Sequence, residues 1–160
     1  MRARPAVAAD ADALAAIYNE GIADGIATFE TRQRTADEVK PWLGGRFPAV
    51  VVANDAGTVI AFAATSEYRP RDCYAGIAEF SVYAARAARG QGAGRLAMRH
   101  LVEEARKAGF WKLVSRVFVE NGASRALLRG LGFREVGIYE RHGQLHGRWR
   151  DVVIVERLLD

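Results

Sequence analysis

Hydrophobic and polar positions change period near the middle of the chain, and this change organises the rest of the prediction. From Glu79 to Tyr83, aromatic and β-branched residues alternate with polar ones, which predicts a strand. The next segment, Arg89 to Arg95, is rich in glycine and predicts a turn. A helix ending at Gly109 should follow, because small and apolar residues fall near one helical stripe: Ala93, Leu96, Ala97, Leu101, Ala105 and Ala108.

The N-terminal part of the pattern predicts an edge strand and then a helix. The segment from Arg2 to Val7 is short and contains a proline, which an edge strand tolerates. Asp10 is placed to cap a helix over residues 11–21, where apolar residues recur at helical spacing. Residues 21–29 fit either a continued helix or a loop, because their glycines suggest bends.

A second helix and a hairpin come next. Thr35 and Glu38 fit a capping box, so a helix should begin there and run through Leu43 until two glycines stop it. Residues 49–53 and 58–65 are apolar and flank a turn of Asn, Asp and Gly. This arrangement predicts two antiparallel strands.

Three strands and a short helix complete the pattern. Residues 112–119 are rich in strand-forming side chains, and a short helix opened by Asn121 closes at Gly132. Residues 134–139 and 149–158 predict two final strands around a loop rich in glycine and histidine. The whole pattern indicates a single α/β (α+β) domain over residues 1–160, with a mixed central sheet of about seven strands and about four helices.

Composition agrees with one globular domain. The chain has 160 residues, half of them hydrophobic, with a formal charge of +4 and a pI of about 9.6. A basic balance suits a polyanionic ligand and is also compatible with weak nucleic-acid binding. Acidic and basic residues are interleaved along the chain, however, so we expect a mixed solvated surface and no nucleic-acid partner.

Several features of other protein classes are missing from the sequence. Cys73 is the single cysteine, so an internal disulfide is impossible and a reducing compartment is compatible. The sequence has no Cys and His cluster for a metal. The first residues lack the apolar core of a signal peptide, and no apolar run has the length of a membrane span. We therefore expect a cytoplasmic protein with no metal and no membrane contact.

The glycine-rich turn has the chemistry of an anion site. A helix start presents unpaired N–H groups and the positive end of the helix dipole, and glycine lets an anion approach them. Arg89 and Arg95 add positive charge. A Walker A loop needs Lys and then Ser or Thr after its last glycine, and a dinucleotide fingerprint needs glycine at position 95. Neither fits, which leaves Arg-x-x-Gly-x-Gly from Arg89 to Gly94, or a plain surface turn without a ligand.

This motif resembles the acyl-CoA pyrophosphate loop of the GNAT N-acetyltransferase superfamily, and the predicted order of elements resembles the GNAT fold over almost the whole chain. A second family mark runs from Glu120 to Ser124 and leads to Leu131-Gly132-Phe133. Within the superfamily, the chain resembles the phosphinothricin and arsinothricin N-acetyltransferase branch. The matching segments are 16–19, 27–31, 68–74, 79–83, 109–115 and 146–152.

The resemblance implies acetyl-CoA as co-substrate and assigns residues to it. Backbone groups of Val82 and Tyr83 should contact the pantetheine arm, where this strand splays from the next one. The complete set of residues expected to bind the cofactor is Val82, Tyr83, Arg89, Gly90, Gln91, Gly92, Ala93, Gly94, Arg95, Asn121 and Ser124.

Acetyl transfer to an α-amine needs a base for the ammonium, donors for the oxyanion and a proton for the departing thiolate. Glu79, Ser81 and Tyr83 share one face of the predicted strand. We take Glu79 as the general base, the role of the family's glutamate at this place; the alternative is a solvent-facing or arginine-paired side chain. His146 matches a histidine of the branch's last loop and is the second catalytic candidate, whereas His142 lacks such a match.

The proton donor for the thiolate stays open at this stage. Many relatives carry tyrosine at the position of Leu128, and a leucine side chain cannot donate a proton. A water molecule, Tyr83 or no dedicated acid are the remaining alternatives.

The resemblance predicts a small glutamate-like amino acid as substrate. Arg71 has the spacing of the branch's anion-binding arginine, with Arg69 as its competitor. Phe29 and Tyr74 are the other expected substrate-binding residues, and ordinary core packing is the alternative for Phe29. The leading hypothesis is N-acetylation of phosphinothricin or arsinothricin by a homodimer. Acetylation of methionine sulfoximine or sulfone, acetylation of a peptide N-terminus, and non-catalytic acyl-CoA sensing are the alternatives.

Overall fold

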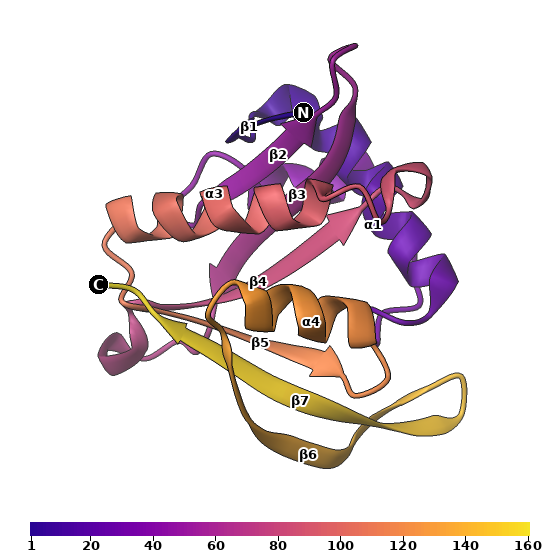
Figure 1. Cartoon of the computed structure of the whole chain (residues 1–160), viewed down its shortest axis with the longest axis vertical. Coiled ribbons are helices and arrows are strands. Elements are labelled where there is room, and N and C mark those ends of the chain that lie inside the picture. The colour runs from indigo at the N-terminus through magenta and orange to yellow at the C-terminus, as the bar shows by residue number, and fades with distance from the viewer.

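The computed structural model describes all residues, 1–160, and contains one seven-stranded sheet in the order β1-β2-β3-β4-β5-β7-β6 (Figure 1). Only β4 and β5 pair in parallel; every other neighbouring pair is antiparallel. The strands are β1 Arg2–Pro5, β2 Ala49–Ala53, β3 Val59–Glu67, β4 Ile77–Ala84, β5 Lys112–Phe118, β6 Arg134–Leu145 and β7 Arg148–Leu158. Four α-helices accompany the sheet, which confirms the predicted fold class: α1 Ala11–Asp24, α2 Ala36–Val39, α3 Ala93–Lys107 and α4 Gly122–Gly130.

The helices divide between the two faces of the sheet. Buried residues of α3 and α4 pack with strand residues into the larger hydrophobic cluster, whereas α1 and the short α2 pack into a second cluster. Helix α3 also makes the crossover that two parallel neighbours, β4 and β5, require. In Figure 1, α3 lies across β2 and β3, and α4 lies over β5.

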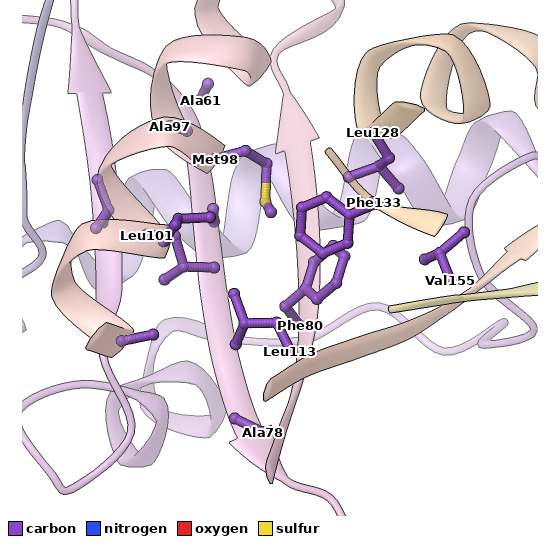
Figure 2. Packing of buried hydrophobic residues seen from close by; sticks show 14 of the residues in the cluster. Ala61, Ala78, Phe80, Ala97, Met98, Leu101, Leu113, Leu128, Phe133 and Val155 are labelled. Atoms are coloured by element: carbon purple, nitrogen blue, oxygen red, sulfur yellow. The ribbon is translucent and has the colours of Figure 1, made fainter. Parts of the chain in front are cut away.

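The larger cluster is held by α3 and by aromatic side chains of the sheet (Figure 2). Leu101 of α3 belongs to the predicted helical stripe and is fully buried, and so is Met98, which the predicted stripe did not include. They lie near Phe80 of β4 and Phe133, whose ring centroids are 4.9 Å apart. This packing seats α3, and with it the glycine turn at its start, against β4.

The parallel pair is short, and its end positions the site. Pairing joins Ile77–Glu79 to residues 112–114, and beyond Glu79 the two strands separate, although β4 continues to Ala84. Across the separation, the Ser115 hydroxyl donates a 2.7 Å hydrogen bond to the Phe80 carbonyl. The splay implied by the family resemblance is therefore present in this chain.

One detail of the first helix differs from the prediction, and a second decides between two alternatives that the sequence left open. The Asp10 side chain does not cap α1; it accepts two hydrogen bonds from the Arg4 guanidinium, at 2.8 and 2.9 Å, and one from the Val7 N–H. The Arg4 guanidinium holds the pKa of the Asp10 carboxyl below its usual range. The helix also passes through Gly21 and ends where Gly25 adopts a left-handed conformation, with φ of 67°.

The second predicted helix is correct at its start and wrong in its length. Thr35 and Glu38 form the expected capping box. The α-helix ends at Val39, and residues Lys40–Trp42 continue as a 3₁₀ turn. Pro41 explains the change, because its ring removes a hydrogen-bond donor and crowds the preceding turn.

The predicted loop between the last two strands is wrong. Strand β6 continues to Leu145 and β7 begins at Arg148, so only His146 and Gly147 form the turn. Both have positive φ, 51° and 77°, as a two-residue hairpin turn requires. The glycines and histidines that suggested a loop lie in a strand interrupted by bulges. None of the four helices combines the length and the apolar character needed to cross a bilayer.

Two leucines test how much of the stability comes from the α3 interface. Leu101→Ala should lower the free energy of unfolding by about 3 kcal/mol, because it leaves a cavity where the wild-type side chain is fully buried. Leu158→Ala, at a side chain 67 % exposed, is the matched control and should cost less than about 0.5 kcal/mol. Urea unfolding of both variants measures the difference; equal losses would contradict this account of the core.

Candidate active site

The separation of β4 and β5 opens a narrow slot through the sheet. This slot has a volume of about 50 Å³, and Leu128 forms part of its lining. On one side it shares Val82 and Asn121 with a groove at the start of α3. On the other side it shares Ser81 and Arg116 with a larger cavity. The slot therefore joins two binding spaces on opposite faces of the sheet.

The groove has a volume of about 330 Å³ and is built around the N-terminus of α3. Gly92 precedes the helix with φ of 86°, and no side chain caps the first N–H groups. Those groups are thus available to an external anion. All the sequence-predicted cofactor residues line the groove except Gln91: Val82, Tyr83, Arg89, Gly90, Gly92, Ala93, Gly94, Arg95, Asn121 and Ser124.

Acidic residues of α1 hold the glycine turn in place. The Arg89 guanidinium lies 2.5 Å from the Asp24 carboxylate, and Arg86 contacts the other Asp24 oxygen at 2.9 Å. Arg86 and Arg89 together hold the pKa of Asp24 below its usual range. The turn is thereby fixed to the end of α1.

The far wall of the groove is set by a side-chain cap. The Asn121 side-chain oxygen accepts a hydrogen bond of 3.2 Å from the Ser124 N–H, which starts α4. Its amide nitrogen donates to the Ile26 carbonyl at 3.2 Å, which ties α4 to the segment after α1. Asn121 therefore has a structural role in addition to its place in the groove.

Backbone direction in β4 places one N–H in the slot. Carbonyl and N–H groups alternate in direction along a strand, and the pairing of β4 with β3 is continuous. The Phe80 carbonyl points toward β5, where it meets Ser115, so the Val82 N–H points the same way. Strand β5 no longer pairs there, which leaves this N–H free to bind an oxygen in the slot.

On the opposite face, Glu79 stands between two cavities of about 370 and 460 Å³. Its side chain is 27 % exposed and lies 2.6 Å from the Arg116 guanidinium of β5. The other terminal nitrogen of Arg116 lies 3.3 Å from the His142 ring nitrogen Nε2. Glu79 is thus paired with an arginine of the neighbouring strand, which the sequence pattern did not single out.

A bulge in β6 places His142, and not the expected His146, at the 460 Å³ cavity. Tyr139 pairs with Val152 and Gly143 with Arg150, so three residues of β6 oppose one of β7. This irregularity brings His142 into the 460 Å³ cavity. His146 lies in the exposed hairpin turn and lines neither cavity. The spacing of histidines in the sequence carries no signal for this difference.

The expected substrate residues divide between the two cavities. Tyr74 lines the 370 Å³ cavity with Tyr68 and Arg69, whereas Arg71 does not line it and lies 6.0 Å from the centre of the Tyr74 ring. The structure thus places the competitor Arg69, and not Arg71, at the cavity. Arg69 takes part in no ion pair.

Phe29 belongs both to the core and to the cavity. Its ring packs against Phe118 with centroids 4.8 Å apart, and it lines the 460 Å³ cavity. A Cβ atom at Gly143 would lie 2.9 Å from this ring, so glycine allows β6 to pass close to it.

Two phenols line the 460 Å³ cavity beside the slot. Burial raises the pKa of Tyr83, and burial likewise raises that of Tyr18; both phenols are within reach of the Thr28 hydroxyl. Tyr83 therefore stays neutral and can donate a hydrogen bond. The structure contains no group of three or more His, Cys, Asp or Glu side chains that could hold a metal ion.

Comparison with known proteins agrees with this geometry. The chain is 32% identical over 161 residues to the L-methionine sulfoximine/L-methionine sulfone acetyltransferase of Pseudomonas paraeruginosa, covering 98% of this chain and 94% of the relative. A phosphinothricin acetyltransferase from Sinorhizobium meliloti, solved in complex with acetyl-CoA, superposes with a TM-score of 0.92 at 33% identity, covering 99% and 88% of the two chains. A ribosomal-protein-alanine N-acetyltransferase structure from Brucella melitensis gives 0.93 at 34%, covering 99% and 100%.

The family-level comparison extends over most of the site. The model of the acetyltransferase (GNAT) family matches residues 14–133, which include the glycine turn, the splayed strands and α4. With the fold and the relatives in agreement, the chain belongs to the GNAT family of acetyltransferases.

Proposed function

We propose that this protein transfers the acetyl group of acetyl-CoA to the α-amino group of a small amino acid. The observation that carries the proposal is the slot between β4 and β5. It connects the groove with the uncapped N–H groups of α3 to the cavity that contains Glu79. A cofactor on one face of the sheet can therefore meet an amine on the other.

The groove fits acetyl-CoA, which supplies the acetyl group as a reactive thioester. The N–H groups of Ala93, Gly94 and Arg95 are placed to hold the diphosphate, because the helix start offers free donors and positive charge. The Val82 N–H is placed to bind the carbonyl oxygen that gains negative charge during transfer.

Glu79 is the base that the amine requires. An ammonium has no lone pair, so the Glu79 carboxylate accepts its proton, directly or through one water. The freed amine forms the new N–C bond as the C–S bond breaks, and the sulfur leaves with the electron pair. The second proton, which the nitrogen loses as it becomes an amide, passes to the departing thiolate, so that CoA leaves as the thiol. Tyr83 donates a hydrogen bond to the sulfur; its raised pKa makes full proton transfer from the phenol unfavourable.

The 370 Å³ cavity favours a side chain with a compact polar or anionic end. Arg69 offers a guanidinium there, and Tyr68 and Tyr74 offer two phenols whose ring centroids are 5.6 Å apart. Sulfoximine, sulfone and phosphinate groups all present tetrahedral oxygen acceptors. Methionine sulfoximine, methionine sulfone and phosphinothricin are therefore the proposed substrates, with arsinothricin as the arsenic analogue.

Acetylation of a protein N-terminus is the second candidate. Its specific support is the similarity, at 34% identity and over the whole length, to a structure described as a ribosomal-protein-alanine N-acetyltransferase. Both candidate functions use the same groove and the same base. They differ in the group attached to the α-carbon, which is a carboxylate in a free amino acid and a peptide bond in a protein N-terminus.

A substrate panel tests the proposal. Thiol release from acetyl-CoA should be stimulated by at least one of methionine sulfoximine, methionine sulfone, phosphinothricin and arsinothricin, because the cavity accepts their tetrahedral groups. Peptides beginning with alanine serve as the competing acceptors. Tight CoA binding without turnover of any amine would contradict an enzymatic role and favour acyl-CoA sensing.

Glu79→Gln tests the base. The amide cannot accept the ammonium proton, so kcat should fall about 10²- to 10⁴-fold at neutral pH, with less effect at high pH, where more of the amine is already neutral. Glu103→Gln, an exposed change on α3, is the matched control and should retain wild-type activity. Near-wild-type turnover of the Glu79 variant would exclude this role.

Gly94→Asp tests the diphosphate site. The new carboxylate would stand at the first turn of α3, where it suits the helix but repels a diphosphate. A Cβ there meets Leu127 at 3.5 Å and Val82 at 3.7 Å, so a side chain fits. Acetyl-CoA should bind about tenfold more weakly than to the isosteric control Gly94→Asn, and added salt should reduce the difference. Equal affinities in calorimetry would place the diphosphate elsewhere.

A further inference from the structure

Glu79 and Arg116 form an ion pair that lies between the 370 Å³ and the 460 Å³ cavities. Both side chains line the 370 Å³ cavity and also the 460 Å³ cavity, so each is reached from two sides. The Arg116 side chain is 48 % exposed, and its nitrogen lies 2.6 Å from the Glu79 oxygen. The pair is therefore accessible to a ligand that enters either cavity.

The ion pair occupies one oxygen of the proposed base and places a positive charge beside it. The Arg116 guanidinium donates to one Glu79 oxygen only, so an ammonium that approaches the other oxygen comes close to a second positive charge. Arg116 has no second carboxylate partner; its remaining contact is the His142 ring. A simple amine brings no anion to offset this repulsion, or to replace the charge-assisted hydrogen bond that Arg116 loses if it moves away, and its binding is therefore disfavoured.

A free amino acid resolves this conflict with its own charges. One carbon atom separates the amine nitrogen from the carboxylate carbon, so the α-carboxylate necessarily arrives close to any group that contacts the amine. The guanidinium beside Glu79 lies where that carboxylate would be. An anion at the end of the substrate side chain is several bonds farther away, within reach of Arg69 in the 370 Å³ cavity.

We propose that Arg116 binds the α-carboxylate of the substrate, so that the zwitterionic head group of a free amino acid replaces the Glu79–Arg116 ion pair. This inference rests on the proposed amino-acid acetylation and makes it more specific. Arg116 then selects against peptide N-termini and simple amines, which have no α-carboxylate. The Arg116 side chain thereby distinguishes acetylation of a free amino acid from acetylation of a protein N-terminus.

The test compares an acid with its amide. For methionine sulfone and for phosphinothricin, kcat/KM of the wild type should exceed that for the α-carboxamide about ten- to a hundredfold, the range of a lost charge-assisted hydrogen bond. Arg116→Gln should lose activity toward the acid and should leave the reaction of the amide unchanged or faster, because no unpaired guanidinium then opposes the amine. Arg116→Lys should recover part of the preference. Arg99→Gln, on the exposed surface of α3 and free of ion pairs, should keep the full preference.

Other outcomes overturn the inference in distinguishable ways. If Arg116 only orients Glu79, its variants will lose activity equally toward acid and amide. Equal wild-type activity toward acid and amide, or toward peptides beginning with alanine, refutes carboxylate binding even if an Arg116 variant fails to fold. A wild type that acetylates no free amino acid refutes the proposed function and this inference together.

Discussion

The parting of β4 and β5 after Glu79 is the constraint on which the rest of the site depends. Two neighbouring strands normally satisfy each other's backbone groups, and a separation inside the sheet leaves donors and acceptors that need other partners. Here the Ser115 hydroxyl donates a hydrogen bond to the Phe80 carbonyl, and the Val82 N–H remains free for a ligand. The same separation makes the slot, so the opening and the free donor beside it have one structural cause.

Charges on both sides of the slot are arranged before any ligand arrives. Asp24 holds Arg89 at the glycine turn, and Glu79 holds Arg116 between the 370 Å³ and 460 Å³ cavities. The first pair fixes a loop, because its carboxylate comes from the neighbouring α1. The second pair lies between two cavities and lines both of them. Similar ion pairs therefore have different consequences, which depend on what else can reach them.

Irregularities in the β6–β7 hairpin determine which side chains line the 460 Å³ cavity. A bulge opposite Asp151 turns His142 toward Arg116, and Gly143 lets the strand pass close to the Phe29 ring. The turn itself uses His146 and Gly147 in left-handed conformations. Extra residues in a strand thus redirect side chains without ending the pairing.

The sequence by itself determined the class of fold and the anion-binding character of the glycine turn, because both depend on local signals. Strand alternation, the helical stripe of α3 and the glycines between them act over a few neighbouring residues. The family resemblance supplied the eleven expected cofactor residues, of which ten line the groove. The two cavities that contain Glu79 depend on contacts between segments that are distant in the sequence. Arg116 meets Glu79 from 37 positions away, and His142 is reached only through a bulge, whereas His146 lies outside the cavities. Side-chain pairing across strands follows register, and only the tertiary structure decides register where bulges interrupt the alternation.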